Sequence, residues 1–162
     1  MTRREFFRKA TGGFTFIELL VTVGVLMVLA SAALPLARVS MKRQREAELR
    51  AALRQMRLAI DKFKDMADAQ IISPMEVAFG SEGYPKSLTQ LVEGVARNND
   101  ATGLKTKFLR RIPIDPMTGD TDWGMRSYQD RPDSATWGGQ NVYDVYSKSA
   151  GIALDGTKYK DW

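Results

Sequence analysis

The longest apolar segment of the chain begins after Glu18. The nineteen residues from Leu19 to Ala37 carry no charged side chain. As a helix rising about 1.5 Å per residue, residues 14–37 would span about 36 Å, which exceeds a bilayer core of about 30 Å. The pattern therefore predicts a hydrophobic transmembrane or assembly helix over residues 14–37. Pro35 has no amide hydrogen to donate, so we expect it to kink or loosen this helix.

Apolar residues keep a helical spacing beyond this segment. They recur every three or four residues as one stripe, formed by Leu49, Leu53, Met56, Ile60, Phe63 and Ala67. The opposite face is charged and consists of Arg50, Arg54, Arg57, Asp61, Lys64 and Asp68. Glu46 and Arg50 have the spacing of an ion pair between successive helical turns. We therefore expect an amphipathic helix over residues 38–68 whose stripe carries a small domain, with a free coiled coil as the alternative.

Turn-forming residues divide the last part of the chain, residues 69–162, into short elements. Breakers occur at Ser73-Pro74 and over residues 80–85. Ser87 is the expected N-cap of a short helix whose apolar face consists of Leu88, Leu91, Val92 and Val95. Residues 97–107 are polar, and we expect them to form a loop.

Strand signals follow near the C-terminal end. Residues 125–129 form one short run, and residues 141–147 alternate and are rich in Tyr and Val. The sequence Leu154-Asp155-Gly156-Thr157 is typical of a hairpin turn. We therefore expect two to four short antiparallel strands packed across the amphipathic helix, which makes the fold class α+β.

The composition excludes several kinds of chemistry. The 162 residues contain no cysteine and no histidine, so thiol chemistry, disulfides, histidine acid–base catalysis and ordinary zinc sites are excluded. The net charge is +5, and the positive residues concentrate over residues 3–9 and 38–57, on both sides of the apolar segment. This placement is typical of membrane-flanking residues rather than of a nucleic-acid surface, so we expect no nucleic-acid partner.

Glu18 is the exception within the apolar segment. A carboxylate in hydrocarbon costs about 3 kcal/mol or more, so an acidic residue there is a candidate functional residue. Basic residues dominate the preceding residues 1–13, which favours a cytoplasmic N-terminus. The alternative is that the Glu18 side chain reaches the membrane interface and has no functional role.

The stretch around this acid resembles the class III signal of type IV pilins and type II secretion pseudopilins. The resemblance rests on Gly13, Phe14, Thr15, Ile17 and Glu18, with Phe16 where Leu is usual, and on Pro35, the twenty-second residue counted from Phe14. In that family a membrane peptidase cuts after the glycine and methylates the new amine. The resemblance therefore implies cleavage between Gly13 and Phe14 and N-methylation of Phe14. It also implies that Glu18 neutralises the amine of a neighbouring subunit during assembly.

Other interpretations of the N-terminus stay open. Ala30-Ser31-Ala32 has the small-residue pattern of an ordinary secretory cleavage site, although the apolar stretch is longer than such signals usually are. The segment could instead be an uncleaved membrane anchor. Pro35 could be a membrane-helix proline without consequence, because such residues are tolerated there.

Two stretches further along resemble the pseudopilin branch of that family. Residues 84–92 begin with a Tyr-Pro dipeptide that in pseudopilins opens a short second helix, and residues 109–116 resemble the lead into the family's sheet region. The family's next Trp-Gly is delayed here to Trp123-Gly124, so this connection departs from the pattern. The absence of cysteine also favours pseudopilins, since many type IV pilins carry a C-terminal disulfide. The resemblance implies a type IV pilin-like α+β fold.

The last loop resembles one that binds calcium in the major type II secretion pseudopilin. The matching positions are Ser147 and Asp155, but the family's carboxylate-rich insert is replaced by residues 157–160, which include two lysines. Calcium takes six to eight oxygen ligands, so a metal-free loop held by hydrogen bonds is the alternative. The acidic residues Asp115, Asp120 and Asp122 lack the spacing of an EF-hand, and we expect them in a solvated loop.

Taken together, the resemblance implies a structural subunit rather than an enzyme. Such a subunit has a cleaved leader over residues 1–13, a single membrane pass in the inner membrane and a periplasmic part over residues 69–162. It polymerises through its N-terminal helices into the periplasmic pseudopilus of a type II secretion system. Its partners are the prepilin peptidase, minor pseudopilins and the inner-membrane assembly platform. The alternatives are a type IV pilin or minor pilin for adhesion, motility or DNA uptake, and a membrane-anchored periplasmic binding module that never polymerises.

Overall fold

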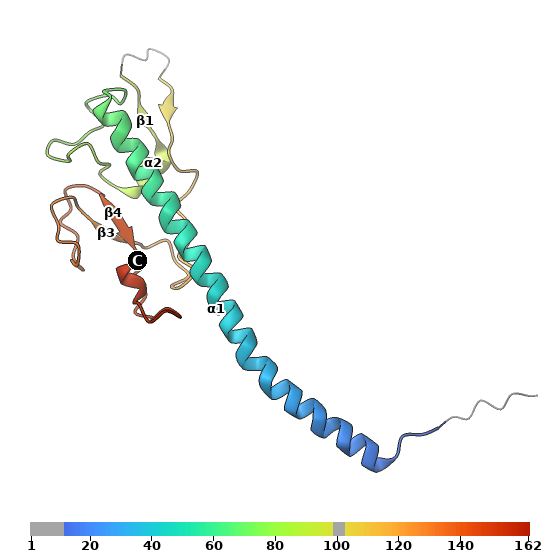
Figure 1. Cartoon of the computed structure of the whole chain (residues 1–162). Coiled ribbons are helices and arrows are strands. Elements are labelled where there is room, and N and C mark those ends of the chain that lie inside the picture. The colour runs from blue at the N-terminus through green and yellow to red at the C-terminus, as the bar shows by residue number, and fades with distance from the viewer. Residues whose placement is uncertain (1–11, 99–102) are drawn as a thin grey trace, which may run out of the picture. The chain divides into compact units, whose positions relative to one another are not determined.

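The computed structural model describes residues 12–98 and 103–162, apart from the side chains of residues 32–34. Most of the predicted leader, residues 1–11, therefore lies outside the described residues. The chain divides into two compact units, Met1–Met41 and Lys42–Trp162. The boundary falls within the long helix α1 (Phe16–Asp68), which confirms the helix expected over residues 14–68 (Figure 1).

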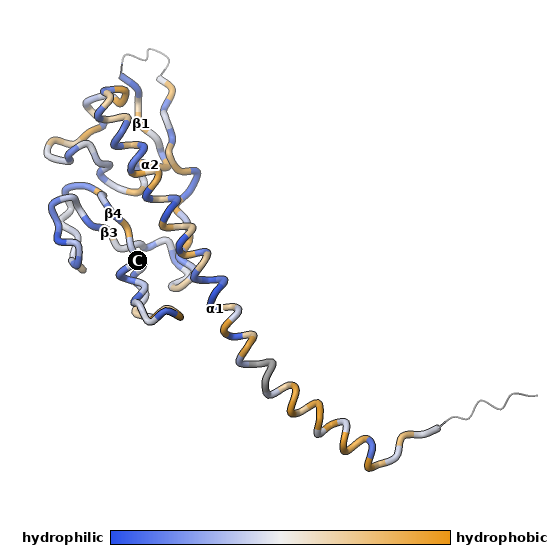
Figure 2. The backbone as a smooth tube through the Cα atoms, viewed as in Figure 1, coloured by the Kyte–Doolittle hydropathy of each residue, from blue (hydrophilic) through white to orange (hydrophobic). Residues whose placement is uncertain are grey.

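The first unit consists mainly of the start of α1. The Thr15 hydroxyl accepts a hydrogen bond from the Glu18 amide at 3.3 Å, and the Thr15 carbonyl accepts one from the Leu19 amide at 3.1 Å. Thr15 therefore satisfies two of the amides that a helix start leaves without partners. Figure 2 shows continuous hydrophobic colouring along most of this part of α1. Within the described residues, α1 is the one helix long and apolar enough to cross a membrane.

The second unit has its core on the apolar stripe of α1. The stripe residues Leu49, Leu53, Met56, Ile60 and Phe63 are buried, with Ala52 and Ala59 beside them, and Met66 and Ala67 are partly buried. The other walls of this core come from far along the chain and include Leu91, Trp123, Val142 and Val145. The predicted amphipathic helix with a small domain on its stripe is thus confirmed.

A short helix and a small sheet follow α1. Helix α2 (Leu88–Glu93) begins at the N-cap Ser87, whose hydroxyl accepts a hydrogen bond from the Gln90 amide, as predicted. Strand β1 (Val95–Ala96) pairs antiparallel with strand β2 (Lys105–Thr106). Two expectations were therefore wrong. Val95 belongs to a strand rather than to the helix face, and the expected polar loop over residues 97–107 contains a strand, because backbone pairing carries no local sequence signal there.

The second sheet lies in the region where strands were expected. Strand β3 (Gly124–Arg126) pairs antiparallel with strand β4 (Asp144–Tyr146), in a register that places Gly124 opposite Tyr146. A side chain at Gly124 would overlap the Tyr146 ring, so this close approach requires glycine. Both strands are shorter than the predicted runs, and both two-stranded sheets are antiparallel, which confirms the α+β class.

The predicted hairpin turn near the C-terminal end is also confirmed. The Ala153 amide donates to the Thr157 carbonyl at 2.8 Å, and the Gly156 amide donates to the Ala153 carbonyl at 3.1 Å. Gly156 has a φ of 87°, a conformation that glycine adopts at little cost. The chain then enters the short 3₁₀ helix η1 (Tyr159–Asp161).

Candidate functional site

The N-terminal motif contains an acidic side chain that has no partner among the described residues. Thr15 and Glu18 have the spacing of a capping box, in which each side chain bonds the backbone of the other residue. Only the Thr15 half of that box is formed. Glu18 is exposed, and its carboxylate makes no hydrogen bond or ion pair within residues 12–98 and 103–162. The sequence analysis missed this capping function of Thr15, although the T-x-x-E spacing could have revealed it.

The residues around Glu18 form an unusually apolar surface. Apart from residues 32–34, whose side chains are not described, the large side chains from Phe16 to Leu36 are exposed, including Phe16 at 81% and Leu26 at 63%. Pro35 lies inside α1 and is exposed as well. Soluble monomers rarely leave apolar patches of this extent uncovered, so such a surface marks contact with lipid or with other protein. Gly13 and Phe14, the predicted cleavage residues, precede α1 and are exposed.

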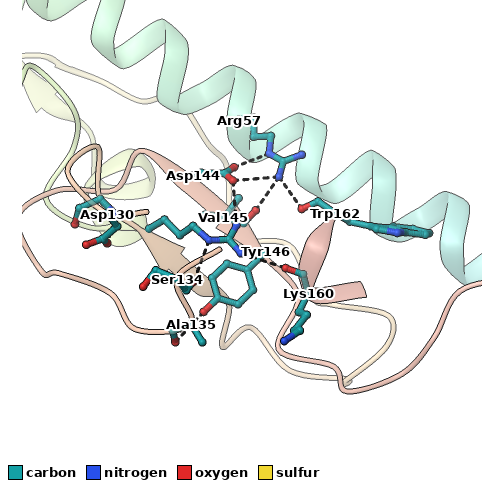
Figure 3. A network of polar contacts seen from close by, with 11 residues as sticks. Arg57, Asp130, Ser134, Ala135, Asp144, Val145, Tyr146, Lys160 and Trp162 are labelled. Carbon is teal, nitrogen blue, oxygen red and sulfur yellow. Dashed lines mark hydrogen bonds and ion pairs between the residues drawn. The ribbon is translucent and has the colours of Figure 1, made fainter. Parts of the chain in front are cut away.

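A polar network in the second unit joins α1 to the C-terminal segment (Figure 3). The Arg57 guanidinium donates to the Asp144 carboxylate, at 2.7 Å from Nε to Oδ1. It also donates to the main-chain oxygens of Val145, at 3.1 Å, and Trp162, at 2.8 Å. One helical side chain thus contacts strand β4 and the residue that follows η1. The sequence analysis placed Arg57 on a charged outer face and missed this role.

A second arginine contributes to the same network. Arg126, on β3, contacts Asp144 at 3.4 Å and donates to the main-chain oxygens of Ser134, at 3.1 Å, and Lys160, at 3.3 Å. Its guanidinium carbon lies 4.1 Å from the centre of the Tyr146 ring, which is a cation–π distance. Asp144 is therefore shared between the two guanidinium groups.

Glu46 is a buried carboxylate on α1. Its side-chain oxygen Oε1 accepts hydrogen bonds from the Leu154 amide at 2.8 Å and from the Tyr159 hydroxyl at 3.0 Å. Burial and the Glu46 carboxylate raise the pKa of Tyr159 to about 12. The expected ion pair of Glu46 with Arg50 was wrong, because Arg50 contacts Asp155 at 3.4 Å and lies over the Trp162 ring. These contacts fasten the C-terminal hairpin to α1.

The two residues matched to a calcium loop take part in separate hydrogen-bonded groups. The Ser147 hydroxyl donates to Asp115 at 2.6 Å. Asp155 accepts hydrogen bonds from the Thr157 hydroxyl and amide, and these bonds and the Arg50 charge hold the pKa of Asp155 below its ordinary value. No group of three or more metal-binding side chains was found among the described residues. Ser147 and Asp155 therefore belong to different hydrogen-bonded groups, and calcium binding stays a prediction.

Asp115 differs from the expectation of a solvated acidic loop. It is fully buried and accepts hydrogen bonds from Ser147 and from the Met117 amide, at 2.7 Å. Asp122 is exposed and pairs with Lys148. The loop containing Asp115 is therefore fixed to the segment after β4 by a long-range contact that the sequence does not reveal.

Comparison with known proteins gives one match. Residues 8–34 match the family model of the prokaryotic N-terminal methylation motif. The matched residues include Gly13, Phe14 and Glu18 and extend into the exposed apolar part of α1. No curated protein and no solved structure matches the chain.

Proposed function

Starting from this prepilin-type methylation signal, we propose that the chain is a structural subunit of a type II secretion pseudopilus. The observation that carries the proposal is the methylation motif at the head of an exposed apolar helix whose acid, Glu18, has no partner among the described residues. In this proposal, the subunit waits in the inner membrane and is then assembled into a short periplasmic filament that helps folded proteins cross the outer membrane.

Processing would create a partner for Glu18, which has none among the described residues. Hydrolysis of the Gly13–Phe14 peptide bond consumes one water, releases the leader and leaves a charged amine on Phe14. The prepilin peptidase then transfers a methyl group from its methyl donor to that amine. Phe14 and Glu18 are four residues apart, so a mature helix that begins at Phe14 would place them on the same face. A buried amine and a buried carboxylate are tolerable only together, so pairing Glu18 with the amine of a neighbouring subunit favours one axial register.

Secretion is favoured over a pilus by features of residues 69–162. The Tyr-Pro segment at residues 84–92 resembles the pseudopilin branch, and the sequence has no cysteine for the C-terminal disulfide of many type IV pilins. The alternative is a type IV pilin or minor pilin. Minor pseudopilins and the inner-membrane assembly platform are the expected partners, and the periplasm is the expected location of the second unit.

The first test is the intact mass of the protein purified from its native membranes. We expect a chain that has lost residues 1–13 and gained one methyl group. A full-length chain would support an uncleaved anchor, and a chain starting near Ala33 would support an ordinary signal peptide. Either of these results would overturn the proposal.

A second test substitutes the unpaired acid. Glu18→Gln should still be cleaved after Gly13 but should reduce filament yield by at least about tenfold, since a buried charge loses its partner. Glu48→Gln is the matched control, because Glu48 is exposed on the same helix and contacts only Gln44 within the described residues. Normal filament yield from Glu18→Gln would contradict the assembly mechanism.

Secretion and pilus functions are separated by a deletion strain. Loss of protein substrates from the culture medium, with motility and DNA uptake intact, would support the pseudopilus. Lost motility or uptake with a normal set of secreted proteins would support the pilin alternative.

A further inference from the structure

The oxygen atoms around Arg57 belong to one carboxylate and two main-chain groups. Its guanidinium contacts both Asp144 carboxylate oxygens, at 2.7 and 3.4 Å, and the main-chain oxygens of Val145 and Trp162 (Figure 3). Arg126 contacts Asp144 from the other side and binds the main-chain oxygens of Ser134 and Lys160. Carboxylate and main-chain oxygens together are the ligand types that calcium prefers.

The charges in this network are close together. The two guanidinium groups supply one positive charge each, and both contact the carboxylate of Asp144. The remaining contacts go to main-chain oxygens. The side chains of Arg126 and Asp144 are mostly buried, at 12% and 25% exposure, so these charges interact more strongly than they would in water. A metal ion entering the same oxygen set would meet two positive charges already in place.

We propose that Arg57 and Arg126 act as built-in cations that hold residues 144–162 on α1, so that this attachment needs no bound metal. Arg57 is the decisive residue, because it alone of the two lies on α1. The proposal differs from the interpretation in which calcium organises the loop containing Ser147 and Asp155. The two guanidinium groups come from outside that loop, from α1 and β3. The proposal does not depend on the proposed function, since it concerns only how the second unit is held together.

The test measures thermal unfolding of the full chain in detergent. All three tryptophans of the sequence, at positions 123, 137 and 162, lie in the second unit, so their fluorescence reports on that unit alone. Arg57→Ala should lower the melting temperature by about 5–10 °C, because Asp144 loses one of its two arginine donors and two main-chain oxygens lose the donor that Arg57 supplies. Arg54→Ala is the matched control and should change it by less than about 2 °C. Arg54 lies one turn away on α1 and makes no hydrogen bond or ion pair with any residue that the structure describes.

Two further measurements test whether residues 144–162 are held on α1 by the positive charge of Arg57 rather than by a metal ion. A chelator should leave the melting temperature of the wild-type chain unchanged, and excess calcium should not raise it. Arg57→Lys keeps the positive charge but lacks the planar guanidinium group with its several donors. It should therefore recover part of the stability that Arg57→Ala loses.

Three results would overturn the proposal. The first is a fall in the wild-type melting temperature on chelation, which would show that a metal does the holding. The second is an Arg57→Ala variant as stable as Arg54→Ala. The third is an Arg57→Lys variant no more stable than Arg57→Ala, because a cation substitute must act through its charge.

Discussion

Glu18 and Glu46 lie on the same helix, and their surroundings differ completely. Glu18 is exposed among apolar side chains and has no partner within residues 12–98 and 103–162. Glu46 is only 5% exposed and accepts hydrogen bonds from Leu154 and Tyr159. The part of α1 up to Met41 thus leaves its apolar surface and its acid without partners among the described residues. In the part from Lys42 onward, the apolar stripe packs against the rest of the second unit, and Glu46 is hydrogen-bonded within that unit.

The difference shows that an apolar helix surface does not by itself indicate which partner it contacts, whether its own domain, lipid or another subunit. Both parts of α1 carry large apolar side chains. In the second part, a stripe of apolar residues meets a small domain. In the first part, apolar residues occur all round and stay exposed, as expected for a surface completed by lipid or by other subunits. Three predictions test this contrast, and each is measured by tryptophan fluorescence on the full chain in detergent.

The largest effect is expected from truncating an apolar residue in each part. Phe63 is fully buried and its ring centre lies 5.3 Å from that of Phe108, so Phe63→Ala should lower the free energy of unfolding of the second unit by about 3–5 kcal/mol. Leu26 is 63% exposed, and Leu26→Ala should leave that free energy unchanged. A similar loss of unfolding free energy in both variants would contradict this difference, because it would mean that Leu26 is buried within the folded chain.

An intermediate effect is expected from the buried acid. Glu46→Ala removes the acceptor for the Leu154 amide and the Tyr159 hydroxyl, which should cost about 2 kcal/mol in the free energy of unfolding. Glu48→Ala, on the exposed face two residues away, should cost less than about 0.5 kcal/mol. Equal losses would show that Glu46 contributes nothing through its hydrogen bonds.

The smallest effect expected is a pH dependence of the stability of the second unit, which arises from Tyr159. The pKa of Tyr159 is raised from 10.0 to about 12 in the folded protein, so the unfolded chain releases this proton first. The resulting stabilisation is complete below pH 10 and is lost between about pH 10 and 12, with a loss of about 1 kcal/mol by pH 11. Unfolding titrations of the wild type and of Tyr159→Phe should therefore converge over this range. A constant difference between the two curves would contradict the assignment.

The sequence predicted the features that depend on local pattern. The stripe from Leu49 to Phe63 indicated the amphipathic helix, because helical periodicity is a local property. Ser87 indicated the start of α2, and Gly156 indicated the hairpin turn, because caps and turns follow from the chemistry of single residues.

The features that were missed depend on which distant segments meet. Arg57 bonds a carboxylate 87 positions away and a main-chain oxygen 105 positions away, and no pattern around Arg57 encodes either contact. Asp115 was expected in solvent, because its neighbourhood is rich in acids, yet it is buried and bonded to Ser147. In the N-terminal motif, Gly13, Phe14 and Glu18 were identifiable because a short contiguous sequence carries them, and the family model matches the same stretch.

The contacts that attach residues 144–162 to α1 also affect how fast the second unit can fold. Small exported domains commonly close their last segment with a disulfide, and forming or reshuffling such a bond takes seconds to hours. This sequence has no cysteine, and its closing contacts are hydrogen bonds and ion pairs from Arg57, Arg126 and Glu46. Such contacts form without an oxidant. The second unit can therefore mature without an oxidation step, so its supply would follow the rate of synthesis and membrane insertion rather than the rate of oxidative folding.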